Sequence, residues 1–96
     1  MQIEMQTMQY THQADPKNRA RLRWRARRGL LENDLILTRY LDAREMDMSD
    51  EEVDAFSRLM DISDNDLMDL LLVRQEPKDD LDLPQVHALL QQLRTI

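Results

Sequence analysis

The sequence predicts an all-α protein, a compact bundle of five short helices. A single glycine and three prolines in 96 residues leave few sharp turns, which counts against a β-sandwich. Apolar residues recur at spacings of three and four, in segments that open with residues common at helix starts. Hydrophobic residues make up 42% and charged residues 33%, a balance typical of a folded helical protein rather than a disordered one.

The first expected helix begins at Asp15-Pro16 and continues to about Arg27. Aspartate accepts hydrogen bonds from the free N–H groups of a helix start, and proline lacks only a donor that would be unpaired there. Arginines alternate with apolar residues here, as in a strand, but Arg, Ala and Leu favour helix and no residue is β-branched. Residues 1–14, rich in Gln and Met without any period, are expected to be a flexible N-terminal tail. Residues 15–96 would then form a single five-helix domain.

Gly29, the only glycine, is expected to break the chain between the first helix and the second. A glycine at such a break supplies either a positive φ or room for a close backbone approach. The second helix is expected to extend to about Ala43, with Tyr40 at the edge of the core. Its broad apolar stripe consists of Leu30, Leu31, Leu35, Leu37 and Leu41.

Three further helices are expected in the second half of the chain. Ser49 and Ser63 each precede an acidic residue by three positions, the spacing of a capping box. Asp82 and Pro84 introduce the last helix. The expected inner faces are Val53, Phe56, Leu59 and Met60, then Leu67, Leu70 and Leu71, and finally Val86, Leu89, Leu90 and Leu93. Isolated helices of this length are marginal in water, so all five must pack around one core.

The residues that carry catalysis or bind metals are sparse. There is no cysteine, which excludes disulfides, thiolate metal sites and a cysteine nucleophile. His12 and His87 have no paired spacing for a metal, and no glycine-rich phosphate loop is present. Four aspartates resemble a calcium loop but lack its central glycine and final glutamate, and a solvated acidic face is expected instead. They are Asp61, Asp64, Asp66 and Asp69.

Charge is distributed unevenly along the chain. Residues 1–28 hold seven of the 13 Lys and Arg but two of the 19 Asp and Glu, in a chain of net charge −6. Separated charge of this kind steers and orients association, which favours a docking partner. The basic segment around Trp24 could also bind phosphates and stack on a base, so a nucleic-acid-binding regulator stays open. No apolar run is long enough to cross a bilayer, and we expect a cytoplasmic protein without membrane insertion.

Arg28 and Glu32 flank the glycine at a spacing of four. If the second helix has begun by Arg28, the two side chains share one face and form a charged fork beside a point of close approach. The surrounding sequence is WRARRGLLENDLIL, and the capped segment MSDEEVDAFSRLMDISDNDLMDLLL follows. Together these segments resemble the SdhE family of flavinylation factors over roughly residues 17–75. The family pattern Arg-Gly-x-x-Glu is matched by Arg28, Gly29 and Glu32, and the aspartate two places further by Asp34.

The resemblance implies a function. It implies an assembly factor that binds the flavoprotein subunit of succinate dehydrogenase and promotes covalent attachment of FAD to its histidine. The family often serves fumarate reductase too, and the sequence leaves open whether that enzyme is a second client. No catalytic residue and no cofactor of its own are implied, and a monomer that releases its client is expected. A carrier that binds FAD itself is the alternative within flavin chemistry, although the chain lacks a nucleotide-binding loop.

The partner-binding residues expected from this resemblance are Arg28, Gly29, Glu32, Asp34 and Trp24. Arg28 and Glu32 are expected to reach the partner near its flavin, while Gly29 lets the two backbones approach closely. Trp24 is expected to anchor the interface or pack. Asp34 could instead cap the helix or pair with Arg39, five residues further on.

Overall fold

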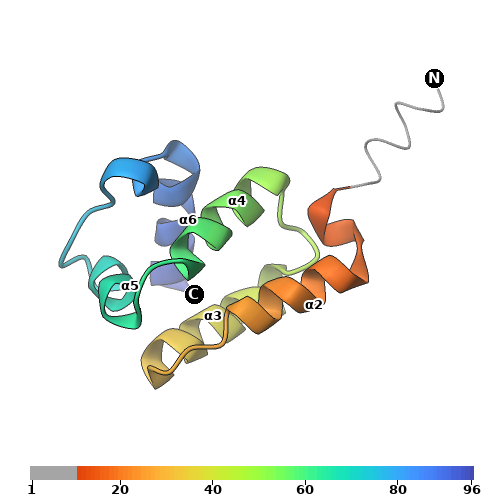
Figure 1. Ribbon diagram of the computed structural model, residues 1–96, viewed down its shortest axis with the longest axis horizontal. Helices are drawn as coiled ribbons and strands as arrows, with labels where there is room; N and C mark the ends of the chain where they lie inside the picture. Colours follow the sequence, from red (N-terminus) through yellow and green to blue (C-terminus); the bar gives the residue numbers. More distant parts are fainter. Residues whose placement is uncertain (1–10) are drawn as a thin grey trace.

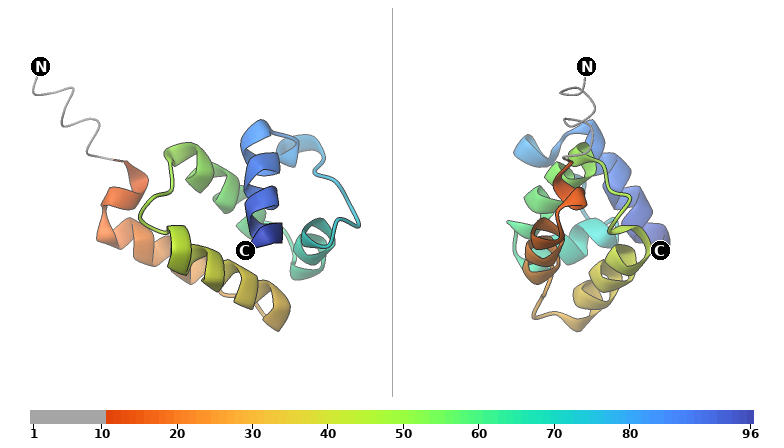
Figure 2. Two further views of the ribbon diagram at one scale, coloured as in Figure 1. Left: turned by 180° about the vertical axis from the view of Figure 1, so that it is seen from behind. Right: turned by 90° about the vertical axis from the view of Figure 1, so that its right-hand side faces the viewer.

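The computed structural model describes residues 11–96, and its five α-helices confirm the predicted all-α class. The helices are α2 (Pro16–Arg25), α3 (Leu31–Arg44), α4 (Asp50–Met60), α5 (Asp64–Leu71) and α6 (Pro84–Thr95), with 3-10 turns η1 (His12–Ala14) and η2 (Asp79–Leu81). Helices α2 and α3 run in opposite directions along one side of the molecule, and α4, α5 and α6 lie on the other (Figure 1). Seen end-on, α2 and α3 diverge from the loop that joins them (Figure 2).

Side chains cap three of the helices as the sequence predicts. The carboxylate of Asp15 accepts from the Lys17 N–H at 2.8 Å. The Ser49 hydroxyl accepts from the Glu52 N–H at 3.1 Å, and the Glu52 carboxylate accepts in return from the Ser49 N–H at 2.9 Å. Ser63 caps α5 by accepting from the backbone N–H three residues on, at 3.1 Å. These bonds satisfy donors that a helix start otherwise leaves free.

The core is one cluster centred on α4, which packs against α6. Every residue of the three predicted inner faces in α4, α5 and α6 is buried, so those predictions are confirmed. Phe56 of α4 stacks on Tyr40 of α3 with ring centroids 6.2 Å apart. Tyr40 is therefore fully buried, not at the core edge as expected.

The predicted stripe of α3 is wrong in part. Leu37 and Leu41 are buried, but Leu31 and Leu35 point to solvent, 66% and 50% exposed. The buried side of the helix instead includes its polar residue Asn33, which is fully buried and donates to the backbone oxygen of Asp64 at 2.9 Å. A buried amide must be hydrogen-bonded, and with Asn33 on the buried side the two leucines point outward.

The boundary of the expected tail also differs. Gln13 is buried and donates to the Glu45 carbonyl at 2.8 Å, while the His12 N–H donates to the Asp50 carboxylate at 2.8 Å. Residues 11–14 therefore belong to the fold, and residues 1–10 lie outside the described residues. The first helix ends at Arg25, two residues earlier than predicted.

Ionisation of Tyr40 makes the free energy of unfolding depend on pH in the alkaline range. Burial, and then the nearby Glu52 carboxylate, raise the pKa of Tyr40 to about 12 from its ordinary 10.0. Because the folded protein holds this proton more tightly than the unfolded chain does, the free energy of unfolding is highest below the unfolded pKa. It should fall by roughly 2–3 kcal/mol as pH rises from about 10 towards 12. Urea unfolding across this range should show that loss in the wild type and not in Tyr40→Phe.

At neutral pH, Tyr40→Phe should be about 1 kcal/mol more stable than the wild type in the same urea unfolding measurement, because the Tyr40 hydroxyl is buried without a partner among the described residues.

Val73 closes α5 in a strained conformation. Its φ is 60°, a left-handed value that costs a residue with a Cβ about 1–2 kcal/mol. The turn lets the Arg74 N–H donate to the Asp69 carbonyl at 2.8 Å, which completes the helix end. Val73→Gly should therefore raise the free energy of unfolding by about 1 kcal/mol. Leu72→Gly, at a neighbouring exposed position with φ −90°, should not stabilise, and equal gains for both would contradict this account.

Candidate docking surface

Arg28 turns inward and ties the α2–α3 loop to the end of α4. Its guanidinium donates to the carbonyls of Leu59 at 3.1 Å and Ile62 at 3.3 Å. Its Nε lies 3.4 Å from Asp64 Oδ1, an ion pair whose side chains are 13% and 27% exposed. A cation at a helix C-terminus satisfies free carbonyls and complements the helix dipole.

The predicted pairing of Arg28 with Glu32 is not found among the ion pairs of residues 11–96. Helix α3 begins at Leu31, so Arg28 lies in the preceding loop and shares no helix face with Glu32. Glu32 is exposed in the first turn of α3.

Gly29 is in close contact with Asp64 of the same chain. Its N–H and that of Leu30 donate to Asp64 Oδ2 at 3.1 and 3.3 Å, and a Cβ on Gly29 would lie 3.3 Å from the same oxygen. The φ of Gly29 is not positive, so a close approach, not backbone conformation, is what favours glycine here. The expectation that Asp64 lies on a solvated acidic face is wrong, because its carboxylate binds these two N–H groups and faces Arg28.

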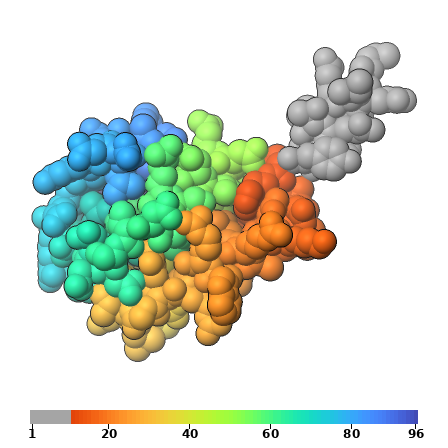
Figure 3. Space-filling model, in the orientation of Figure 1, coloured from red at the N-terminus to blue at the C-terminus, as the bar shows by residue number. Residues whose placement is uncertain are grey.

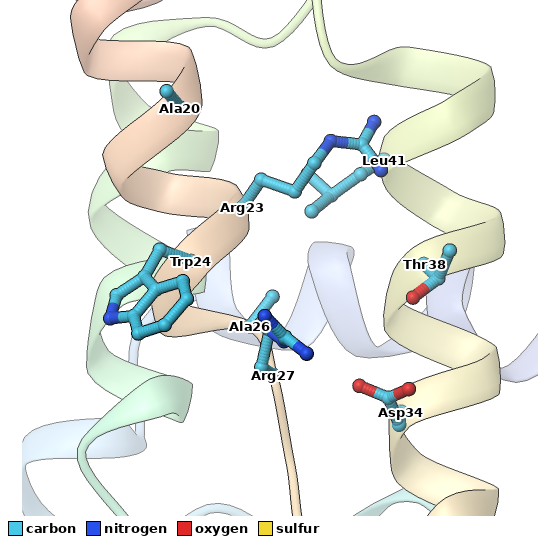
Figure 4. A pocket seen from close by; sticks show the side chains of 8 residues that line it. All are labelled: Ala20, Arg23, Trp24, Ala26, Arg27, Asp34, Thr38 and Leu41. Carbon is cyan, nitrogen blue, oxygen red and sulfur yellow. The ribbon is translucent and has the colours of Figure 1, made fainter.

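Asp34 accepts from the Arg28 N–H at 3.2 Å, and the alternative pairing with Arg39 is not among the ion pairs of residues 11–96. It also faces a groove of about 420 Å³ between α2 and α3 (Figure 4). Trp24, 69% exposed, stands on the α2 wall with the Arg27 guanidinium 5.1 Å from its ring centroid. Asp34 and Thr38 stand on the α3 wall, opposite Arg27 (Figure 4). The groove thus offers an aromatic surface, a cation and oxygen acceptors together.

The basic residues of α2 and the following loop divide into two sets. The inward set binds the chain's own oxygens: Arg19 to the Gln13 carbonyl, Arg23 to Asp42 and Glu45, Arg25 to Asp61, and Arg28 to Asp64. The hydrogen bond to Glu45 raises the pKa of Arg23. Within residues 11–96 the side chains of Lys17, Arg21 and Arg27 have neither a hydrogen bond nor an ion pair.

These outward cations share a face with the tryptophan. Lys17, Arg21 and Trp24 follow one another at spacings of four and three, which places them along one side of α2, and Arg27, in the loop after the helix, lies against the Trp24 ring. Such a row of unpaired cations around an exposed ring favours contact with an acidic surface, because nothing within the described fold neutralises it.

The exposed face of α3 continues this surface. Leu35 is three or four residues from Leu31, Glu32 and Thr38, so helical spacing makes it their neighbour. Two large apolar side chains therefore lie between the groove and Glu32. We call the whole face the α2–α3 surface, formed by Lys17, Arg21, Trp24, Arg27, Leu31, Glu32, Leu35 and the groove. Figure 3 shows the side chains of α2, in orange, beside those of the start of α3, in gold.

Trp24, Asp34 and Glu32, which the sequence singled out as partner-binding residues, lie on or beside this surface, whereas the two leucines had been assigned to the core. The available signal was the width of the predicted stripe, since five leucines spread over 12 positions of α3 and its cap cover more than one buried face. Asp64 was missed because its role depends on a contact with residues far along the chain.

Fold and surface together define a small all-helical protein with an exposed basic, aromatic and apolar face. In the part of the chain that the structure describes, no group of three His, Asp or Glu side chains could hold a metal ion. None of the helices in residues 11–96 has the length and apolarity that crossing a membrane requires.

The chain belongs to the family described as "Flavinator of succinate dehydrogenase", whose sequence profile matches residues 20–95. The FAD assembly factor SdhE of Ralstonia nicotianae is 53% identical over 90 residues, covering 94% of this chain and 95% of the relative. The factor of the same name from Yersinia pseudotuberculosis is 36% identical over 74 residues, covering 77% and 83%. That of Legionella pneumophila strain Lens is 35% identical over 68 residues, covering 70% and 85%. No solved structure matches. The resemblance to the SdhE family is thereby confirmed.

The inward role of Arg28 predicts a difference from its neighbour Arg27. Arg28→Ala should lower the free energy of unfolding by about 2–3 kcal/mol, since it frees two carbonyls and leaves the Asp64 carboxylate facing no cation. Arg27→Ala loses only an exposed contact with Trp24 and should cost less than about 1 kcal/mol. Chemical denaturation followed by circular dichroism measures both. Similar losses for the two variants would show that Arg28 does not hold the loop.

Proposed function

We propose that this chain is an assembly factor that binds the flavoprotein subunit of succinate dehydrogenase and promotes covalent attachment of FAD to a histidine of that subunit. The observation that carries the proposal is the α2–α3 surface. It includes Glu32, the last residue of the family's Arg-Gly-x-x-Glu pattern, and it exposes Trp24 and two leucines beside it. Relatives that carry the name FAD assembly factor support the flavin chemistry.

The interaction itself follows from the makeup of this surface. Leu31, Leu35 and the ring of Trp24 supply apolar area whose burial drives association. Lys17, Arg21 and Arg27 select an acidic patch on the partner, while Glu32 requires a donor or cation there. Asp34, already bound to the Arg28 N–H, supports the wall of the groove and contributes its remaining lone pairs. Arg28 and Gly29 support this surface indirectly, because their contacts with Asp64 fix the α2–α3 loop.

In this proposal the chain acts on flavinylation by holding its client, without a catalytic residue or cofactor of its own. Docking keeps the flavoprotein subunit in a conformation where its histidine meets the flavin in attack geometry. Groups of the client then stabilise the negative charge that develops on the isoalloxazine. A factor with this role binds transiently, as a monomer of moderate affinity. The flavoprotein subunit of fumarate reductase is proposed as a second client.

A flavinylation assay tests the proposal directly. Purified apo flavoprotein subunit is incubated with FAD and this protein, denatured, and separated on a gel that reveals covalently retained flavin by fluorescence. The wild type should accelerate labelling. Glu32→Ala and Leu35→Ala should raise the concentration needed for half-maximal acceleration at least about fivefold, roughly 1 kcal/mol of binding each.

Matched controls separate a surface effect from a general one. Glu51→Ala removes an exposed glutamate from α4, and Leu72→Ala removes a similarly exposed leucine from the end of α5. Both should behave as the wild type. Equal labelling with and without the protein would reject the assembly role. Tight binding of free FAD in equilibrium dialysis would favour a carrier instead, and salt-dependent binding of random duplex DNA would favour a nucleic-acid-binding regulator.

A further inference from the structure

Residue 64 is the point at which the α2–α3 loop joins the rest of the fold. Its carboxylate accepts from the N–H groups of Gly29 and Leu30 and faces the Arg28 guanidinium. Its backbone oxygen accepts from the buried Asn33 amide at 2.9 Å. Four contacts from the segment 28–33 thus converge on the first residue of α5.

The Asp64 carboxylate takes the place of a capping side chain for α3. The residue at the N-cap position is Leu30, which has no side-chain acceptor. Free N–H groups at a helix start need an acceptor, and an anion there also complements the helix dipole. Asp64 supplies both from another helix, through its bonds to the Leu30 and Gly29 N–H groups.

This arrangement bears on how the α2–α3 surface is presented. Leu31 and Glu32 are the first two residues of α3 and are exposed, so their placement depends on the loop and helix start behind them. Without the carboxylate, the Gly29 and Leu30 N–H groups lose their acceptor and this helix start frays. A partner would then have to order the segment on binding, which weakens association.

We propose that Asp64 is a positioning residue for flavinylation, which acts by holding the Arg28–Leu30 turn and thereby fixing Leu31 and Glu32 for the flavoprotein. The inference rests on the proposed function and adds a residue outside the surface itself. Asp64 is well suited to a separate test, because the bonds from Arg28 to the Leu59 and Ile62 carbonyls do not involve its carboxylate.

The experiment compares Asp64→Asn and Asp64→Ala with Asp66→Asn. Asp66 lies in the same first turn of α5 and is exposed, and its described hydrogen bond is made by its backbone N–H to Ser63, so the control removes the same charge without touching the loop. Two quantities are measured on the full chain: amide hydrogen exchange at each residue, and the concentration for half-maximal flavinylation.

In Asp64→Asn the Gly29 and Leu30 amides should exchange at least tenfold faster, while core amides such as that of Leu59 keep their wild-type rates. The half-maximal concentration should rise at least threefold, with the rate at saturation within twofold of wild type. Asp64→Ala should show the same pattern more strongly, and Asp66→Asn should match wild type in both measurements.

Several results would overturn the inference. Faster exchange throughout the core of Asp64→Asn would make Asp64 a general stability residue. Unchanged exchange at Gly29 and Leu30, or released amides with a normal half-maximal concentration, would separate Asp64 from the docking surface. These failures are distinguishable from failure of the proposed function, in which the wild type itself would not accelerate labelling.

Discussion

The contact between Arg28 and Asp64 connects the two parts of this fold. Arg28 belongs to the loop that follows the basic helix, and Asp64 begins α5, so their pairing joins the α2–α3 side of the molecule to the side formed by α4, α5 and α6. Each partner also satisfies backbone groups: Arg28 the Leu59 carbonyl near the end of α4 and the Ile62 carbonyl just after it, Asp64 the N–H groups before α3. The bonds to the Asp64 carboxylate hold the turn that leads into α3.

The excess of arginine in α2 has two physical explanations. The inward arginines neutralise carboxylates of α3, of the residue that follows α4, and of α5, which an acidic chain needs in order to bring these helices together. The outward cations, Lys17, Arg21 and Arg27, have no such use within the described fold. Within α2, Lys17 and Arg21 point to a different side of the helix from the paired arginines, so one segment can both support the fold and present a surface.

Most of the fold could be predicted from local sequence. Capping at Asp15, Ser49 and Ser63 depends on residues two or three positions apart, and the inner faces of α4, α5 and α6 follow helical periodicity. The prediction failed where a distant partner decides the outcome. Leu31 and Leu35 fit an apolar stripe as well as Leu37 does, and contacts with distant residues, among them the bond from Asn33 to the Asp64 carbonyl and the stacking of Tyr40 on Phe56, decide which side of α3 is buried.

The sequence by itself determined the helical class, the three helix starts capped by Asp15, Ser49 and Ser63, the uneven charge and the family pattern at Arg28, Gly29 and Glu32. The tertiary structure decided what those residues do. It turned Arg28 inward, made Asp64 the neighbour of Gly29, and left Glu32 exposed beside two leucines. The physical reason is range: caps and periodicity act within a few residues, whereas Asp64 meets Gly29 across 35 positions of the chain. Such a contact forms only once the helices between them have packed.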